Sequence, residues 1–369
     1  MLIRKIEIYK SPIRLKEPFI ISLGSVYHAE NIIVVIRTDE EISGFGECNP
    51  FRTINGESID TCFVVGEYLG HALAGKDPLD IEACHSLMDK TIFGNSSIKS
   101  AFDIALYDIA SRNAGLPLYA FLGGEKKRDL ITDYTVSLGS PEKMAEDAAK
   151  IVANGFQVIK VKLGNIGTND VGRVKKIHER IGSDIPLRID ANQGWSRDEA
   201  VSTLKQLKDY NIQFCEEPIP RWDFMNLPGI RLKNLIPVMA DESCCDHHDA
   251  ERLIRIKAAD YFNVKLGKSS GIYKALKIVR LAEKAGMQMQ VGGFLESRLG
   301  FTASAHLALC SDNIKFCDFD TPLMLQDDPV TGGITYGPRG EVYVPESPGT
   351  GATVDEKYLK TLTCSTIDV

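Results

Sequence analysis

Apolar and polar residues alternate in the first part of the chain. The alternation covers residues 2–15 and returns in residues 31–37, and a polar turn at residues 39–41 precedes a further short apolar segment. A period of two is typical of β-strands that bury one face. We therefore predict antiparallel strands over these segments.

The spacing then becomes helical. In residues 96–113 apolar side chains recur every three or four positions, which predicts a helix. Asn95 or Ser96 can cap its start, and Gly115 is expected to end it. Residues 1–125 are therefore predicted to form an α+β capping domain.

After about Asp129 the chain changes to short apolar runs separated by amphipathic stretches. Such an alternation is the signature of repeated βα units and a parallel sheet. Eight units close into a barrel. The eight runs are residues 129–138, 158–164, 185–195, 212–218, 236–243, 259–267, 286–297 and 314–322. We predict an α/β fold with a (β/α)-barrel over residues 126–322, and a tail, residues 323–369, that returns to the capping domain.

Composition and charge narrow the class of protein. The 369 residues are 44% hydrophobic and 25% charged, which suits a globular protein of two parts. The net charge of -7 argues against binding to nucleic acid or an anionic membrane, because both need clustered positive charge. No apolar run approaches the roughly 20 residues of a membrane span, and the nine scattered cysteines form no CxxC pair. We expect a cytoplasmic homo-oligomer that acts on a small molecule.

One polar residue stands near the end of each predicted barrel strand. In such barrels the catalytic side chains come from the C-terminal ends of the strands. The residues are Thr135, Lys160, Asp190, Glu216, Asp241, Lys265, Glu296 and Asp318, spaced 22 to 31 residues apart. They are expected to surround one mouth of the barrel.

Asp190, Glu216 and Asp241 end three consecutive predicted strands, so their carboxylates should converge. Like charges so close together need a cation, and oxygen ligands favour a hard ion. We predict a Mg²⁺ site, with Mn²⁺ as a substitute. None of the seven histidines lies in a predicted barrel strand, which argues against zinc. Asn192 and Glu242 are expected to lie next to the ligands.

Lysines occur on two opposite predicted strands. Lys160 and Lys162 share one face of the second strand, and Lys265 faces them from the sixth. A single lysine on a strand is usually a solvated side chain, but these interrupt segments that should be continuously apolar. If neighbouring cations lower their pKa, one neutral lysine could remove a proton next to a carboxylate and the other return it on the opposite face. This arrangement predicts racemisation or epimerisation.

Five segments resemble the enolase superfamily, in particular its muconate lactonizing enzyme branch. They are KVK at residues 160–162, DANQGW from Asp190, EEP from Glu216, ADES around Asp241 and NVKLGKSSGI around Lys265. Residues 101–124 also resemble the link between cap and barrel in that family. The resemblance implies that the three carboxylates bind Mg²⁺, that Lys162 and Lys265 are the acid/base pair, and that Lys160 is an electrostatic partner.

The muconate lactonizing enzyme branch includes cycloisomerases, o-succinylbenzoate synthases, acylamino acid racemases and dipeptide epimerases. Residues of the last predicted strand distinguish among these reactions. Asp318 and Asp320 resemble the Asp-x-Asp element by which dipeptide epimerases hold the α-ammonium group of the substrate. Residues two apart on a strand share a face, so both carboxylates can bind one cation. The alternative is a pair that only starts a loop. We predict a dipeptide epimerase that inverts the C-terminal residue of L-Ala-D/L-Glu or a similar Xaa-Glu dipeptide.

The resemblance places substrate choice in two cap loops. These loops lie near residues 19–27 and 49–55. L-Ala-D/L-Glu epimerases carry an arginine in the first loop, where this chain has Ser25 and its neighbours. Ser25 and, in the second loop, Arg52 are therefore expected to bind substrate, with Glu296 and the adjacent Arg298 as further candidates.

Other functions remain open at this point. Within the same branch the alternatives are an N-acylamino acid racemase, an o-succinylbenzoate synthase and a muconate-type cycloisomerase. A lysine aldolase that forms a Schiff base would need no metal. A barrel that only binds a ligand is also possible, because a fold does not dictate a function.

Overall fold

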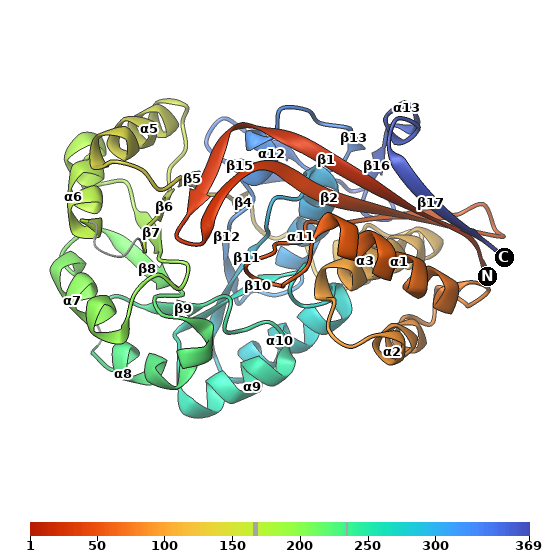
Figure 1. Cartoon of the computed structure of the whole chain (residues 1–369), viewed down its shortest axis with the longest axis horizontal. Helices are drawn as coiled ribbons and strands as arrows, with labels where there is room; N and C mark the ends of the chain where they lie inside the picture. Colours follow the sequence, from red (N-terminus) through yellow and green to blue (C-terminus); the bar gives the residue numbers. More distant parts are fainter. Residues whose placement is uncertain (165–168, 234) are drawn as a thin grey trace.

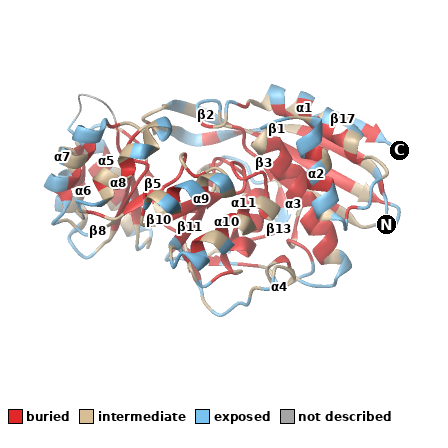
Figure 2. Ribbon diagram, turned by 90° about the horizontal axis from the view of Figure 1, so that it is seen from below, coloured by how far each residue is buried: buried red, intermediate tan, exposed pale blue. Residues whose placement is uncertain are grey.

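The computed structural model describes residues 1–164, 169–233 and 235–369. These residues form a curved parallel sheet surrounded by helices and, beside it, an antiparallel sheet with its own helices (Figure 1). Buried residues run through both parts (Figure 2). No helix in the described ranges is long and apolar enough to cross a membrane.

The antiparallel sheet has the strand order β17-β1-β2-β3. Its strands are β1 (Ile3–Ile21), β2 (Gly24–Thr38), β3 (Ser43–Cys48) and β17 (Thr363–Asp368), and its helices are α1 (Ile59–Leu73), α2 (Ile81–Thr91) and α3 (Ser96–Asn113). Ile6 and Ile8 of β1 pack against these helices, as the alternating pattern predicts. We call this α+β part the cap. The tip of the β1–β2 hairpin extends over the barrel (Figure 1), where Ile20 O accepts a hydrogen bond from Leu138 N.

Helix α3 covers the predicted residues and has Asn95 at its N-cap position as predicted, but the Asn95 side chain makes no capping hydrogen bond. Asn95 has a left-handed backbone, and its side-chain amide donates to Phe93 O. The carboxylate of Glu57 caps the helix instead, accepting from Ser97 N at 2.9 Å and from Ile98 N at 3.4 Å. A negative charge is favourable at a helix N-terminus. Glu57 is distant from α3 in the sequence, so the local pattern of residues does not reveal that it caps this helix.

The parallel sheet contains eight strands in sequence order. They are β5 (Tyr134–Val136), β6 (Ile159–Lys162), β7 (Leu187–Asp190), β8 (Ile212–Glu216), β9 (Val238–Ala240), β10 (Tyr261–Lys265), β11 (Gln288–Gly292) and β12 (Ile314–Cys317). A parallel bridge between Thr132 and Cys317 joins the first strand region to the last. The predicted barrel is confirmed, and each strand lies within its predicted segment.

Helices follow the barrel strands and pack their apolar faces on them. They are α5 (Pro141–Ala153), α6 (Asp170–Ile181), α7 (Arg197–Leu207), the 3-10 helix η1 (Arg221–Asn226) with α8 (Leu227–Arg231), α9 (His247–Ile256), α10 (Ile272–Lys284), α11 (Arg298–Ala308) and α12 (Thr321–Met324). The last helix has only four residues, because the chain then pairs with the cap through a bridge between Leu15 and Leu325.

The remaining elements connect the two parts. They are α4 (Leu118–Phe121), β4 (Leu130–Ile131), β13 (Val330–Gly332), β14 (Thr335–Tyr336), β15 (Glu341–Tyr343), β16 (Ala352–Val354) and α13 (Glu356–Leu359). β17 pairs with β1, so residues 363–368 lie in the sheet of the cap. β15 instead pairs with β4, which directly precedes the barrel.

Candidate active site

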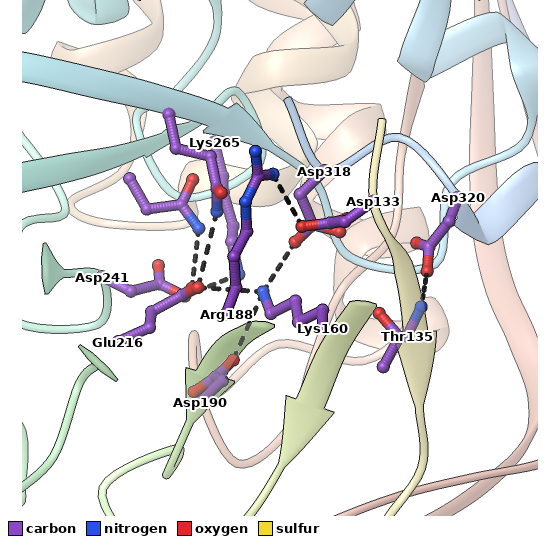
Figure 3. A network of polar contacts seen from close by, with 12 residues as sticks. Asp133, Thr135, Lys160, Arg188, Asp190, Glu216, Asp241, Lys265, Asp318 and Asp320 are labelled. Carbon is purple, nitrogen blue, oxygen red and sulfur yellow. Dashed lines mark hydrogen bonds and ion pairs between the residues drawn. The ribbon is translucent and has the colours of Figure 1, made fainter. Parts of the chain in front are cut away.

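Three carboxylates meet at the C-terminal ends of neighbouring barrel strands. Asp190 ends β7, Glu216 ends β8 and Asp241 directly follows β9. All three are at most 1% exposed, and parallel pairing sets Asp190 beside Glu216. Lys160 Nζ lies 2.9 Å from Glu216 Oε2 and 3.4 Å from Asp190 Oδ2 (Figure 3). The predicted carboxylates are thus brought together, with one lysine between two of them.

The other two predicted lysines approach these carboxylates from opposite sides. Lys162 Nζ on β6 is 2.6 Å from Asp190 Oδ2, and Lys265 Nζ on β10 is 2.6 Å from Asp241 Oδ2. β6 and β10 are four strands apart in an eight-stranded barrel, so they face each other across it. Two amines are therefore available to opposite faces of a molecule held between them.

Lys162 and Lys265 line one narrow cavity of ≈ 30 Å³ under the cap. The ring of Phe19 lies 5.6 Å from Lys162 Nζ, and that of Phe294 lies 5.1 Å from Lys265 Nζ. The other lining residues are Ile21, Phe51, Ile54, Thr135, Asn192, Gly293, Leu295, Asp318, Asp320 and Thr321. Cap residues supply only apolar side chains to this lining, and every charged side chain in it comes from the barrel.

The three buried carboxylates offer oxygen ligands that suit a divalent cation. Burial, and then the neighbouring Asp190, raise the pKa of Glu216 to about 7. Burial would also raise the pKa of Asp241, but Lys265 and Lys268 hold it well below its usual value. A hard ion bound by oxygen atoms would relieve the repulsion between Glu216 and Asp190.

The pKa values of Lys160 and Lys265 are raised, whereas the sequence predicted that neighbouring cations would lower them. Burial lowers the pKa of Lys160, but Asp318 and Glu216 raise it well above its usual value. Burial likewise lowers the pKa of Lys265, and Asp241 more than compensates. Each ammonium is therefore stabilised by carboxylates from other strands, which only the fold brings into contact with it.

Asn192 and Glu242 lie next to the carboxylates, as predicted. Asn192 N donates to Asp190 Oδ1 at 2.9 Å, and its Nδ2 donates to Glu242 Oε1 at 3.3 Å. Burial, and then Asp241, raise the pKa of Glu242 well above its usual value. The carboxylate of Glu217, which follows Glu216, accepts a hydrogen bond from Asp241 N at 2.7 Å. These contacts hold the backbone of the carboxylate-bearing segments.

Sequence reasoning missed Lys268, which is 3% exposed. Its Nζ donates to Asp241 Oδ1 at 2.5 Å and also to Asp241 O. Asp241 therefore lies between two ammonium groups, because Lys265 contacts its other oxygen. Lys265 and Lys268 are three residues apart in the segment KLGK. On a strand, this spacing would place them on opposite faces, but the chain between them is a turn.

A second group of carboxylates lies beside the first. Atoms of Asp133, Asp318 and Asp320 come within 4.8 Å of one another. Each is already partnered: Lys160 Nζ contacts Asp318 Oδ2 at 2.7 Å, and Thr135 N donates to Asp320 Oδ2 at 2.6 Å. Asp133 pairs with an arginine (Figure 3). We assign the metal to Asp190, Glu216 and Asp241 and none to this group, because the family resemblance described above implies the metal there.

The pKa values of the two predicted aspartates of this group are shifted in opposite directions. Burial would raise the pKa of Asp318, but Lys160 lowers it to about 2. Burial, and then Asp318, raise the pKa of Asp320 to about 7. Both side chains line the cavity with the lysines. They could therefore bind a positively charged group of a molecule in it.

Arg188 is a further buried residue that was not predicted, although it shares a strand face with Asp190. Its Nη1 donates to Asp133 Oδ2 and to Cys317 O, both at 2.8 Å. Arg188→Met should lower the free energy of unfolding by about 3–5 kcal/mol, because removal of one partner of a buried pair leaves Asp133 Oδ2 and Cys317 O without their donor. Urea unfolding measures this loss.

Arg52 provides the control for that measurement. Its side chain is 66% exposed and lies 3.0 Å from Glu30. Arg52→Ala should therefore cost less than about 1 kcal/mol. A loss as small as this in Arg188→Met would contradict the structural role of the Arg188–Asp133 pair.

The remaining predicted substrate residues lie outside the cavity. Ser25 and Arg52 line a separate outer pocket of ≈ 330 Å³. Glu296 is buried and accepts from Phe294 N at 2.6 Å, and burial raises its pKa to about 7. Arg298 lies 2.5 Å from Asp328 and donates to backbone carbonyls. None of the four lines the cavity that contains the lysines.

Comparison with known proteins agrees with this arrangement. Residues 3–123 match the family model of the mandelate racemase / muconate lactonizing enzyme N-terminal domain, and residues 143–358 match the enolase C-terminal domain-like model. A D-Ala-D/L-Ala epimerase of Cytophaga hutchinsonii is 58% identical, with 98% of each chain covered. A hydrophobic dipeptide epimerase of Enterococcus faecalis is 39% identical over 95% of this chain and 99% of its own.

A solved structure is equally similar. The dipeptide epimerase of Cytophaga hutchinsonii, complexed with Mg and the dipeptide D-Ala-L-Val, superposes with a TM-score of 0.99 at 58% identity and full coverage of both chains. The folds, the two matched domains and the identity over nearly the whole chain all agree. The chain belongs to the mandelate racemase / muconate lactonizing enzyme family of the enolase superfamily.

Proposed function

We propose that this protein is a Mg²⁺-dependent dipeptide epimerase, an isomerase that inverts the α-carbon of the C-terminal residue. The observation that carries the proposal is the pair Lys162 and Lys265, which line one cavity from opposite sides. Relatives named as dipeptide epimerases support the same reaction. The substrate would lie with its α-carbon between the two amines, and the cavity must widen to admit it, because ≈ 30 Å³ holds only a few water molecules.

Asp190, Glu216 and Asp241 would hold the Mg²⁺ ion, for which Mn²⁺ could substitute. When bound, this ion neutralises negative charge that develops on the substrate carboxylate. Lys160, which contacts Glu216 and Asp318, would add a fixed positive charge on the same side. With the carboxylates engaged in this way, they no longer raise the pKa of the lysines to the same extent.

The two lysines would transfer the proton. For one epimer, the neutral Nζ of Lys162 takes the α-proton and the ammonium of Lys265 donates a proton to the opposite face. For the other epimer the roles reverse. One lysine must be neutral and the other protonated at the start of each cycle. The rings of Phe19 and Phe294 beside the two amines exclude water from the reacting centre.

Asp318 and Asp320 would bind the free α-ammonium group of the dipeptide. Both line the cavity, and the lowered pKa of Asp318 keeps its charge at neutral pH. An N-acylated amino acid has no such cation to offer. This pair therefore favours a dipeptide over the acylamino acids and over wholly anionic substrates.

The cavity favours an apolar second residue instead of the glutamate predicted from the family resemblance. Its cap side is formed by Phe19, Ile21, Phe51 and Ile54. Arg52 points into the outer pocket and pairs with Glu30, so it offers no charge to a glutamate inside the cavity. We propose dipeptides such as D-Ala-D-Ala and D-Ala-L-Val, in line with the substrates named for the Cytophaga relative.

Proton NMR in D₂O with Mg²⁺ tests this proposal. We expect exchange of the C-terminal α-proton and appearance of the second diastereomer with D-Ala-D-Ala and D-Ala-L-Val. L-Ala-D-Glu should react with a kcat/KM at least about 10-fold lower, because a buried carboxylate without a partner costs more than about 1.4 kcal/mol. N-acetyl-D-Ala-L-Val, which lacks the ammonium group, is the matched control and should react more slowly still. Faster exchange with the acetylated compound would overturn the dipeptide assignment.

Three sequence predictions stay as proposals. We propose the domain boundaries 1–125, 126–322 and 323–369, with the last segment completing the cap. The cytoplasmic location and the homo-oligomeric state also remain predictions, and size-exclusion chromatography with light scattering would test the latter.

A further inference from the structure

Residues 265–271 form a turn between β10 and α10, which we call the Lys265 turn. It begins with Lys265 and ends with Gly271, the residue before α10. Ser269 N donates to Lys265 O at 3.1 Å, and Gly271 N donates to Leu266 O at 2.9 Å. Such a closed turn moves as a unit, so the start of α10 and the backbone of Lys265 are mechanically connected.

A carboxylate from the cap holds the start of α10. Asp103, on α3, is fully buried, and its Oδ2 accepts from Ile272 N and, at 3.4 Å, from Tyr273 N. Gly271 has no side chain to cap the helix, and a Cβ there would lie 2.2 Å from Asp103 Oδ2. Helix α3 packs against α10 (Figure 2). The cap thus supplies the N-terminal capping group of a barrel helix.

A histidine fixes Asp103 from the other side. His85 Nε2, on α2, lies 2.5 Å from Asp103 Oδ1, and the His85 ring stacks on Tyr273 with the ring centroids 4.7 Å apart. Asp103 therefore has a partner on each oxygen, one in the cap and one in the barrel. His85, Asp103 and the first turn of α10 form one continuous buried contact.

We propose that Asp103 and His85 are positioning residues that set the place of Lys265, and that the cap thereby controls one of the two bases as well as covering the cavity. This inference rests on the proposed epimerisation. Lys162 lies on β6, across the cavity from the Lys265 turn. Loss of the Asp103 contact should therefore disturb proton transfer on one face of the substrate and spare the other.

Exchange of the α-proton with D₂O, measured separately from each epimer, gives the required readout. In a two-base reaction each lysine removes the proton of one epimer, and Lys265→Ala identifies the epimer that Lys265 serves. Asp103→Ala should slow exchange of that epimer about 10-fold to 100-fold relative to the other, because small displacements of a catalytic group have effects of this size. Asp103→Asn keeps an acceptor oxygen. It should therefore shift the ratio of the two exchange rates less than Asp103→Ala does.

Asp108→Asn is the matched control. Asp108 lies on the same helix, is equally buried and accepts from Phe45 N at 3.1 Å and Thr350 N at 2.7 Å, away from the Lys265 turn. It should leave the ratio between the epimers unchanged. If Asp103→Ala does not fold, His85→Gln tests the same contact and should shift the ratio in the same direction.

Two outcomes would overturn the inference in different ways. An unchanged ratio in the Asp103 and His85 variants, with normal exchange by the unmodified protein, would overturn it alone. Absence of exchange by the unmodified protein with every dipeptide would overturn the proposed function, and this inference with it.

Discussion

Lys162→Ala should lower the rate of epimerisation by about 10³-fold or more. Lys162 is one of only two amines that line the cavity in the described part of the chain, and general bases contribute roughly 10²–10⁴-fold to rates. Proton exchange should be lost for the epimer that Lys162 serves and persist for the epimer that Lys265 serves. Proton NMR in D₂O distinguishes loss of exchange from loss of epimerisation in one experiment.

Lys315, an exposed lysine on β12, is the control for this substitution. Lys315→Ala removes a barrel-strand lysine without touching the cavity, so both exchange rates should stay within about 2-fold. If Lys162→Ala epimerises at a rate close to that of the unmodified protein, the two-base mechanism is wrong.

Removal of divalent metal should have a comparable effect. Chelation with EDTA should lower turnover by roughly 10³-fold, because a bound metal contributes several kcal/mol of charge stabilisation. Addition of Mg²⁺ or Mn²⁺ should restore it. Glu216→Gln removes one of the three buried carboxylates and should weaken metal binding, which titration with Mn²⁺ measures directly by electron paramagnetic resonance.

Glu346→Gln controls for the loss of one carboxylate, since Glu346 is exposed and pairs only with Lys126 among its described contacts. Its Mn²⁺ affinity should equal that of the unmodified protein. Full activity after chelation would contradict the metal site and favour chemistry through a Schiff base on lysine, which borohydride would trap.

The barrel and the carboxylate–lysine site were predictable from sequence for a simple geometric reason. Parallel strands end at one mouth, so residues at equivalent strand positions meet whatever the loops between them do. Asp190, Glu216 and Asp241 occupy such positions, as do Lys162 and Lys265. Spacing along the chain therefore translates directly into proximity.

The loops and long-range contacts were not predictable in this way. Arg52 lies in a cap loop, and its pairing with Glu30 depends on how that loop folds against β2. Glu57 and Asp103 cap helices to which they are not adjacent in sequence. The pKa values of Lys160 and Lys265 depend on the carboxylates that each ammonium contacts. Each of these features requires a three-dimensional contact between residues that no sequence period connects.

The pairing of β17 with β1 also bears on how the protein folds during synthesis. Strand β1 leaves the ribosome long before its partner, residues 363–368. Until then one edge of β1 presents unpaired backbone groups, which can pair with other chains. The barrel, whose strands are sequence neighbours, can assemble earlier. The sheet of the cap is therefore completed after the barrel strands have been synthesised, and a chain that lacks β17 keeps an edge strand that can pair with other chains.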